Sequence, residues 1–336
     1  MQTVTAACNA MATRFEMVLH GENAIALRAA ADEAFQLIER LHAQLSLYLP
    51  SSEVSFINRH AARRPVRVEP GLFRLLQLAQ RIHQETRGAF DITIAPLLRC
   101  WGFMGGTGKL PTPEAVSKAR AKVGMQHVVL DEVHSTVRFD REGMMLDLGS
   151  IGKGYALELA TETLLEAGVQ NALLHGGTST VCAIGKPPDA ESWKVAISAP
   201  PVVQDSDPRR QSVSHANAAG REPPMAVVSL ENESLSVSGV HGKSFTVDGE
   251  TYGHVIDPCT GAPAQGALTA VVVLPSATET DAFSTALLLA GMAGQAEVAR
   301  LRPNMRTLVA ERNRETGELV VATRHLATLQ ATGGCS

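Results

Sequence analysis

An apolar run, AVVVL at residues 270–274, is followed closely by the stretch DAFSTAL at residues 281–287. The β-branched run predicts a strand, and the second stretch predicts the start of a helix. Residues four apart share one face of a helix, so the oxygens of Asp281 and Thr285 can meet one small cation. Free N–H groups at a helix N-terminus suit a phosphate, and oxygen ligands beside a phosphate are typical of Mg²⁺ sites. Asp281 also fits an ordinary helix N-cap, so both interpretations stay open at this point.

Working outward, the chain mixes helices and strands without a regular βαβ repeat, which predicts the α+β class. We expect one domain over residues 1–336, with an exposed, mobile insertion at residues 200–224, where proline, serine and charge are frequent. Residues 46–59 are polar and are expected to be irregular. The expected helices are at residues 24–45, 71–86, 114–123 and 154–167, and the expected strands at residues 14–20, 127–130, 136–139, 172–174, 181–184, 193–198, 226–230, 235–237 and 252–256.

Bulk composition excludes several classes of protein. A hydrophobic content of 45% over 336 residues is ample for a core, and a net charge of -4 argues against nucleic acid as the partner. The five cysteines are scattered without a C-x-x-C pair, which fits neither a disulfide framework nor a zinc site. We found no apolar run of about 18 residues and no signal-peptide pattern at the N-terminus. The sequence therefore predicts no membrane span and a cytoplasmic location, although an exported form stays open because a removed signal leaves no trace.

A glycine-rich stretch, DLGSIGKGY at residues 147–155, joins an expected strand to an expected helix. Lys153 lies in the first turn of that helix, where a cation is unfavourable unless an anion is bound, and this indicates phosphate. The stretch is not a Walker A loop, because Gly154 stands where Ser or Thr is required. A strand-to-helix turn with a solvated lysine is the alternative.

The stretch HVIDPCTG at residues 254–261 combines turn chemistry with a histidine. Its Asp-Pro and Thr-Gly steps are typical of a capped turn and can be purely structural. Near a phosphate, the neutral imidazole of His254 could take a proton from an attacking hydroxyl. A core histidine with no chemical role is the alternative.

Aromatic residues are scarce, at 4% of the chain, so those in expected loops stand out. Tyr48, Trp101 and Phe103 all fall in such loops. They could stack on a flat heterocycle, or they could anchor the core.

Taken together and in this order, the motifs resemble those of the FAD:protein FMN transferases, the ApbE-like flavin transferases. The resemblance covers about residues 11 to 325. The matching stretches are MATRF at 11–15, LSLY at 45–48, FDIT at 90–93, WGF at 101–103, DLGSIGKGY at 147–155, GG at 176–177, SVSG at 236–239, HVIDPxTG at 254–261 and DAxSTA at 281–286.

The resemblance implies an ApbE-like fold and an Mg²⁺-dependent enzyme that moves FMN from FAD to a Thr or Ser hydroxyl of an acceptor flavoprotein, with release of AMP. It implies that Asp281, Thr285 and Ser150 hold Mg²⁺ and that His254 is the catalytic base. The residues that it implies in contact with FAD are Met11, Tyr48, Trp101, Gly102, Phe103, Asp147, Lys153 and His254. The acceptor is expected to carry a D-G-x-x-S/T-G-A-T-like motif; DGETYG at 248–253 does not match it, so the chain is not expected to be its own acceptor.

The sequence departs from the family pattern in two places. Thr178 stands where Asp or Asn is usual, and Ser150 replaces the more usual small residue or Thr. Two alternative functions remain: an FAD pyrophosphatase that gives free FMN and AMP from the same metal site, and a non-catalytic flavin-binding protein. A protein that only binds flavin would not need Asp281, Thr285 and His254 together.

Overall fold

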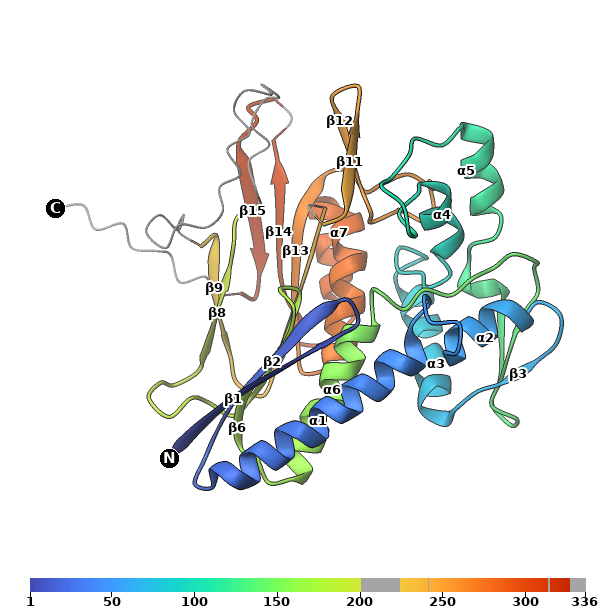
Figure 1. Ribbon diagram of the computed structural model, residues 1–336. Helices are drawn as coiled ribbons and strands as arrows, with labels where there is room; N and C mark the ends of the chain where they lie inside the picture. Colours follow the sequence, from blue (N-terminus) through green and yellow to red (C-terminus); the bar gives the residue numbers. More distant parts are fainter. Residues whose placement is uncertain (201–223, 241, 314, 327–336) are drawn as a thin grey trace.

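The computed structural model describes residues 1–200, 224–240, 242–313 and 315–326 (Figure 1). The predicted insertion at residues 200–224 lies, apart from its two end residues, outside the described residues.

An eight-stranded antiparallel sheet organises the molecule, in the order β1-β2-β6-β7-β10-β13-β14-β15. Its strands are β1 Gln2–Ala10, β2 Thr13–Gly21, β6 Asn171–Gly176, β7 Thr180–Ile184, β10 Ser234–Gly239, β13 Ala267–Leu274, β14 Arg306–Arg312 and β15 Leu319–Arg324.

The run AVVVL lies in β13, and it is apolar throughout because both faces of the sheet are covered. Ala270 and Val272 pack into the main core, whereas Val271 and Val273 pack into a second cluster on the opposite face. Successive side chains of a strand point to opposite faces, so a strand covered on both sides needs an unbroken apolar run. The second cluster is closed by a two-stranded sheet of β8 Trp193–Ile197 and β9 Ala226–Leu230.

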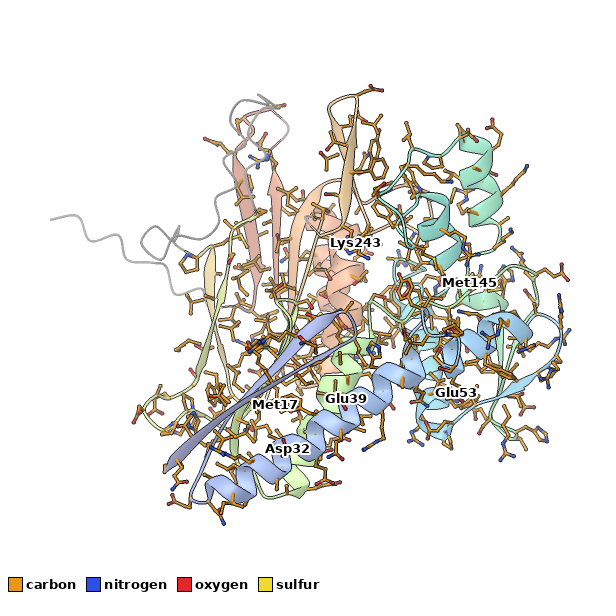
Figure 2. The ribbon with its side chains drawn as sticks, viewed as in Figure 1. Met17, Asp32, Glu39, Glu53, Met145 and Lys243 are labelled. Carbon is orange, nitrogen blue, oxygen red and sulfur yellow. The ribbon has the colours of Figure 1, made fainter. Side chains whose placement is uncertain are left out.

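Three long helices cover the main-core face: α1 Ala24–Leu45, α6 Gly152–Glu166 and α7 Ala277–Ala299 (Figure 1). In α1, Asp32 and Glu39 are exposed while Ala34 and Ile38 are fully buried, which is the pattern of an amphipathic surface helix (Figure 2). Helix α7 packs against both α6 and the sheet, and most of its first half is buried.

Among the described helices, α7 alone is long and apolar enough to cross a membrane by length and composition. Half of its most apolar window is buried inside the fold, which is what a core helix requires.

The remaining elements form a region beside the helices (Figure 1). A hairpin, β11 Ser244–Val247 and β12 Glu250–Gly253, packs its aromatic rings against this region. The other elements are α2 Glu53–His60, β3 Val66–Arg67, α3 Pro70–Glu85, α4 Ala95–Cys100, α5 Pro113–Arg120, the 3-10 turn η1 Met125–His127, β4 Val128–Asp131 and β5 Thr136–Phe139.

The α+β prediction is confirmed, and so are the predicted helices that became α1, α3, α5 and α6. The prediction of an irregular segment at residues 46–59 is wrong for its second half, which α2 occupies. The side chain of Ser52 caps α2, and Val54 and Ile57 are buried beneath it. Two such residues in eight are too few to give a helical period that can be recognised in a sequence.

Candidate functional site

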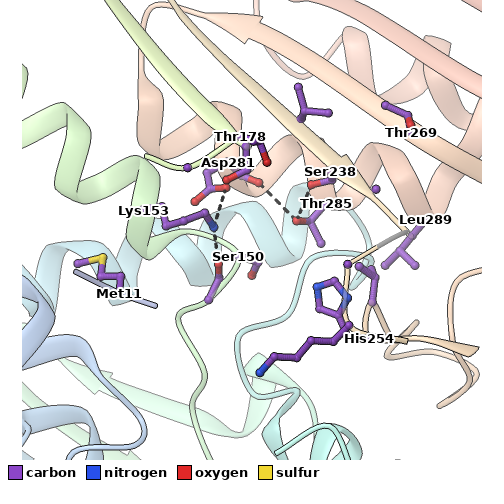
Figure 3. A pocket seen from close by; sticks show the side chains of 18 of the residues that line it. Met11, Ser150, Lys153, Thr178, Ser238, His254, Thr269, Asp281, Thr285 and Leu289 are labelled. Carbon is purple, nitrogen blue, oxygen red and sulfur yellow. Dashed lines mark hydrogen bonds and ion pairs between the residues drawn. The ribbon is translucent and has the colours of Figure 1, made fainter. Parts of the chain in front are cut away.

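A cavity of about 930 Å³ opens where α6 and α7 meet the ends of β6, β7 and β10 (Figure 3). Residues on either side of the β11–β12 hairpin and the segment before α6 line its other side. Every site residue predicted from the sequence lines this cavity except Trp101 and Gly102: Met11, Tyr48, Phe103, Asp147, Ser150, Lys153, His254, Asp281 and Thr285. Segments far apart in the chain are therefore brought to one place.

The structure does not bring Trp101 to the cavity lining that it describes. The ring is 5% exposed, its Nε1 donates to the carbonyl oxygen of Gly261 at 2.8 Å, and it packs against Tyr252 and Phe245. Gly102 forms the turn that follows, with a φ of 73°. Of the two interpretations of these aromatics, the structural anchor applies to Trp101, whereas Tyr48 and Phe103 face the cavity.

Helix α7 begins at Ala277, so the expected helix start at Asp281 is wrong, and the alternative that Asp281 is an N-cap does not apply. Ser276 is the cap: its Oγ accepts the N–H of Glu279 at 3.2 Å. Ser276 and Glu279 are spaced as in a capping box, which is the signal that the sequence did contain. A carboxylate oxygen of Glu158 accepts the N–H of Thr278 at 2.8 Å. The start of α7 thus holds a protein carboxylate, and it does not provide the free anion site predicted for it.

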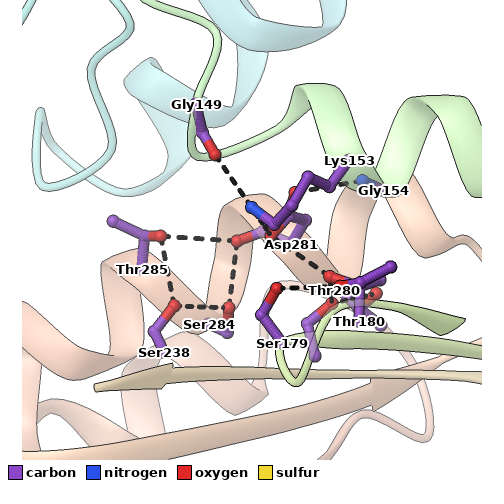
Figure 4. Close-up of polar contacts among 12 residues, drawn as sticks. Gly149, Lys153, Gly154, Ser179, Thr180, Ser238, Thr280, Asp281, Ser284 and Thr285 are labelled. Carbon is purple, nitrogen blue, oxygen red and sulfur yellow. Dashed lines mark hydrogen bonds and ion pairs between the residues drawn. The ribbon is translucent and has the colours of Figure 1, made fainter. Parts of the chain in front are cut away.

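Asp281 instead lies in the second turn of α7, 4% exposed, and faces the start of α6 (Figure 4). Its Oδ2 accepts the N–H of Gly154 at 3.0 Å. Its Oδ1 lies 3.7 Å from Lys153 Nζ and 3.5 Å from the hydroxyl of Thr180. The partial positive charge of the α6 N-terminus stabilises this buried carboxylate. Because both contacts of Oδ1 are long, this oxygen remains available to a cation.

Gly154 allows the backbones of α6 and α7 to touch at this point. A Cβ there would lie 2.2 Å from the carbonyl oxygen of Ala277 and 2.8 Å from the Cβ of Asp281. The glycine is therefore required by helix packing, and the close approach is to another helix rather than to a ligand.

We expect Gly154→Ala to destabilise the protein by about 1–3 kcal/mol, because α6 must move away from α7. Urea unfolding measures the change. Gly152→Ala is the matched control: its nearest foreign atom would be 3.7 Å away, and alanine is the better helix former, so its stability should equal or exceed that of the wild type. Equal effects of the two substitutions would contradict this account of the helix contact.

Thr285 lies one turn after Asp281, and the two share a face of α7 as the sequence predicted (Figure 3). Its Oγ1 is 3.4 Å from the carbonyl oxygen of Asp281 and 3.3 Å from the hydroxyl of Ser238. Ser150 lines the cavity beside Lys153. Within the described residues, no three His, Cys, Asp or Glu side chains cluster as metal ligands. One carboxylate with hydroxyl oxygens fits Mg²⁺, which takes few protein ligands when phosphates and water supply the others.

Two more charged groups complete this part of the cavity. Lys153 lies in the first turn of α6, as predicted, and its Nζ donates to the carbonyl oxygen of Gly149 at 3.0 Å. Asp147 accepts the N–H of Gly149 at 2.8 Å, and burial raises the pKa of its carboxyl group. The residues before Asp147 form only one isolated bridge, at Met145, rather than the expected strand.

His254 directly follows β12, so the predicted strand at residues 252–256 ends one residue before it. Its backbone N–H donates to the carbonyl oxygen of Lys243 at 2.9 Å. Burial lowers the pKa of His254 below its ordinary value of 6.5, and the charges of Lys243 and Lys153 lower it further. Its buried Nδ1 has no hydrogen-bond partner in the part of the chain that the structure describes. The imidazole is therefore neutral at neutral pH, as a general base requires.

Lys243 and Gly242 were missed in the sequence. Ser244 pairs with Gly253 across the β11–β12 hairpin, and this register places Lys243 beside His254. A Cβ on Gly242 would lie 2.5 Å from Cε1 of His254, so the glycine leaves space for the ring. Lys243 and Gly242 can be placed beside His254 only once the hairpin register is known, and no local sequence pattern indicated that register.

A family model, related sequences and solved structures all relate this chain to the same family. A sequence model described as the ApbE family matches residues 11–309. The FAD:protein FMN transferase of Salmonella typhimurium is 31% identical over 261 residues, which are 76% of this chain and 69% of that protein. The ApbE protein of Thermotoga maritima shares the fold with a TM-score of 0.81 at 26% identity, over 95% of this chain and 96% of that one. The apo form of the flavinyl transferase ApbE of Pseudomonas stutzeri has a TM-score of 0.80 at 27% identity, over 96% of this chain and 94% of that one. With the family match spanning most of its length, this chain belongs to the ApbE family.

Proposed function

We propose that this chain transfers FMN from FAD to a Thr or Ser hydroxyl of an acceptor flavoprotein and releases AMP, with Mg²⁺ as the metal. Curated relatives are named FAD:protein FMN transferase, which supports a flavin-transferring enzyme. The observation that carries the proposal is one cavity that gathers a buried carboxylate, two hydroxyl side chains, a lysine and a neutral histidine. The cytoplasmic location and the single-domain organisation stay predictions from the sequence.

Mg²⁺ held by Asp281, Thr285 and Ser150 would offset the charge on the pyrophosphate of FAD. Lys153 supplies a second positive charge for the phosphate oxygens. Met11, Tyr48 and Phe103 offer apolar and aromatic surface for the ring systems of FAD. Because these three side chains lie at different places on the cavity wall, they would orient FAD along the cavity.

His254 accepts the proton of the acceptor hydroxyl as that oxygen attacks the phosphorus atom of the FMN half. A P–O bond forms to the acceptor, and the P–O bond to AMP breaks, with the electron pair leaving on the AMP phosphate. Protein side chains that exclude water from this position favour transfer over hydrolysis.

The pH dependence follows from the lowered pKa of His254. Below that pKa the imidazole is protonated and cannot act as a base, so transfer should rise through a pKa under 6.5 and stay level through neutral pH. Lys243→Met removes a positive charge, raises the pKa and should move the acid limb to higher pH. Lys194→Met, on β8, is the control. Initial transfer rates from pH 4.5 to 8 measure this; an acid limb that Lys243→Met leaves in place would contradict it.

The test of function is the intact mass of a purified acceptor domain after incubation with this chain, FAD and Mg²⁺. We expect a mass increase of one FMN at a Thr or Ser of the D-G-x-x-S/T-G-A-T-like motif, and none when that residue is Val. Free FMN with an unmodified acceptor would instead establish the FAD pyrophosphatase. If neither flavinylated acceptor nor free FMN forms and FAD stays bound and intact, the chain is a non-catalytic flavin-binding protein.

A further inference from the structure

Strand β10 presents a row of three serines to helix α7, and Figure 4 shows the last of them, Ser238. Ser234, Ser236 and Ser238 alternate along the strand, so their side chains share one face. Their hydroxyls reach, in turn, the carbonyl oxygen of Pro275 just before α7 at 3.2 Å, Thr280 Oγ1 at 3.0 Å and Ser284 Oγ at 2.8 Å. Of these serines only Ser238 lines the cavity.

Ser238 stands between two hydroxyls of α7. Its Oγ is 2.8 Å from that of Ser284 and 3.3 Å from that of Thr285. Ser284 donates its own proton to the carbonyl oxygen of Asp281 at 3.0 Å, so its oxygen is an acceptor toward Ser238. The proton of Ser238 therefore goes to Ser284, which leaves the lone pairs of Ser238 to accept the proton of Thr285.

Thr285 has one other acceptor among the described residues, the carbonyl oxygen of Asp281. That contact is 3.4 Å long, and Ser284 already donates to the same oxygen. A hydrogen bond of this length is weak. Ser238 is thus the partner that decides where the Thr285 proton points.

We infer that Ser238 is a positioning residue for the divalent cation: it accepts the Thr285 proton, so that the lone pairs of Thr285 face the cavity. This rests on the proposed function, which assigns Thr285 as a metal ligand. A hydroxyl that binds a cation through its lone pairs must direct its proton elsewhere, and Ser238 provides that direction. Partners of this kind commonly contribute roughly 10–100-fold to metal affinity.

The test uses Mn²⁺ as the probe, with the full chain and saturating FAD but no acceptor, and reads unbound Mn²⁺ by its electron paramagnetic resonance signal. We expect Ser238→Ala to weaken Mn²⁺ binding roughly 10-fold or more. Ser238→Thr keeps the hydroxyl on a side chain that suits a strand, so its Mn²⁺ affinity should be close to that of the wild type. Ser234→Ala removes a buried hydroxyl from the same row, far from Thr285, and should bind Mn²⁺ as the wild type does.

A second measurement is the Mg²⁺ concentration that gives half-maximal transfer. We expect Ser238→Ala to raise this concentration and Ser238→Thr and Ser234→Ala to leave it near the wild-type value, while the KM for FAD does not change. Wild-type affinity in Ser238→Ala, or an equal loss in Ser234→Ala, would overturn the inference and leave the proposed function intact. A loss as complete as that of Asp281→Ala would overturn it as well, because that is the behaviour of a direct ligand. Failure of the wild type to bind Mn²⁺ would overturn the metal assignment itself.

Discussion

His254→Gly is expected to abolish FMN transfer while FAD still binds. The imidazole is neutral because it is buried and lies near two lysines, so its loss removes the base that takes the acceptor proton. General base catalysis is typically worth about 10²–10⁴-fold in rate. Transfer is measured by covalent flavin fluorescence of the acceptor on a denaturing gel, and FAD binding by quenching of flavin fluorescence.

Imidazole added to His254→Gly provides an internal control. The substitution leaves a space beside Gly242, and a free imidazole in that space should recover part of the rate without changing FAD affinity. Near-wild-type transfer without imidazole would remove His254 from the role of base. A large loss of FAD binding would show that the ring shapes the cavity instead.

Asp281→Ala is expected to remove the dependence of transfer on Mg²⁺ concentration and to lower the rate by roughly 10²-fold or more, because several kcal/mol of charge stabilisation are lost at about 1.4 kcal/mol per tenfold. The rate at each Mg²⁺ concentration, with chelator as the zero point, measures this. An Mg²⁺ titration identical to that of the wild type would contradict the assignment of Asp281.

Asp281→Asn separates charge from structure in the same experiment. Asparagine can still accept the N–H of Gly154, so the α6–α7 contact should survive, whereas Asp281→Ala leaves that buried donor without its partner at a cost of about 1–3 kcal/mol. We therefore expect both variants to lose Mg²⁺ dependence and only Asp281→Ala to lose substantial stability in urea.

Long periodic segments were predictable from the sequence, and single contacts were not. Helix α1 has the predicted bounds, because 22 residues of amphipathic pattern outweigh any local ambiguity. The start of α7 was misplaced because Ser276 and Asp281 are both good N-cap residues. The Ser276 and Glu279 spacing of a capping box favours Ser276, and the structure shows that Ser276 accepts the Glu279 N–H while Glu158 holds the N–H of Thr278.

The candidate site shows the same division. The Asp281 and Thr285 pair was predictable because its spacing of four is local to one helix. Ser238 and Lys243 were not, because they reach the cavity through the β10 packing on α7 and the β11–β12 register. The resemblance implied a contact of Trp101 with FAD, and its place in an expected loop left stacking and core anchoring both open; the structure packs its ring against Tyr252 of the hairpin.

The most direct test of the transferase account is the ratio of AMP released to FMN bound covalently by the acceptor, compared with AMP release in its absence. A transferase predicts one AMP for each flavinylated acceptor molecule, and AMP release that depends on the acceptor hydroxyl. AMP released at the same rate with no acceptor, or with the acceptor Thr or Ser changed to Val, would contradict transfer as the function of this cavity.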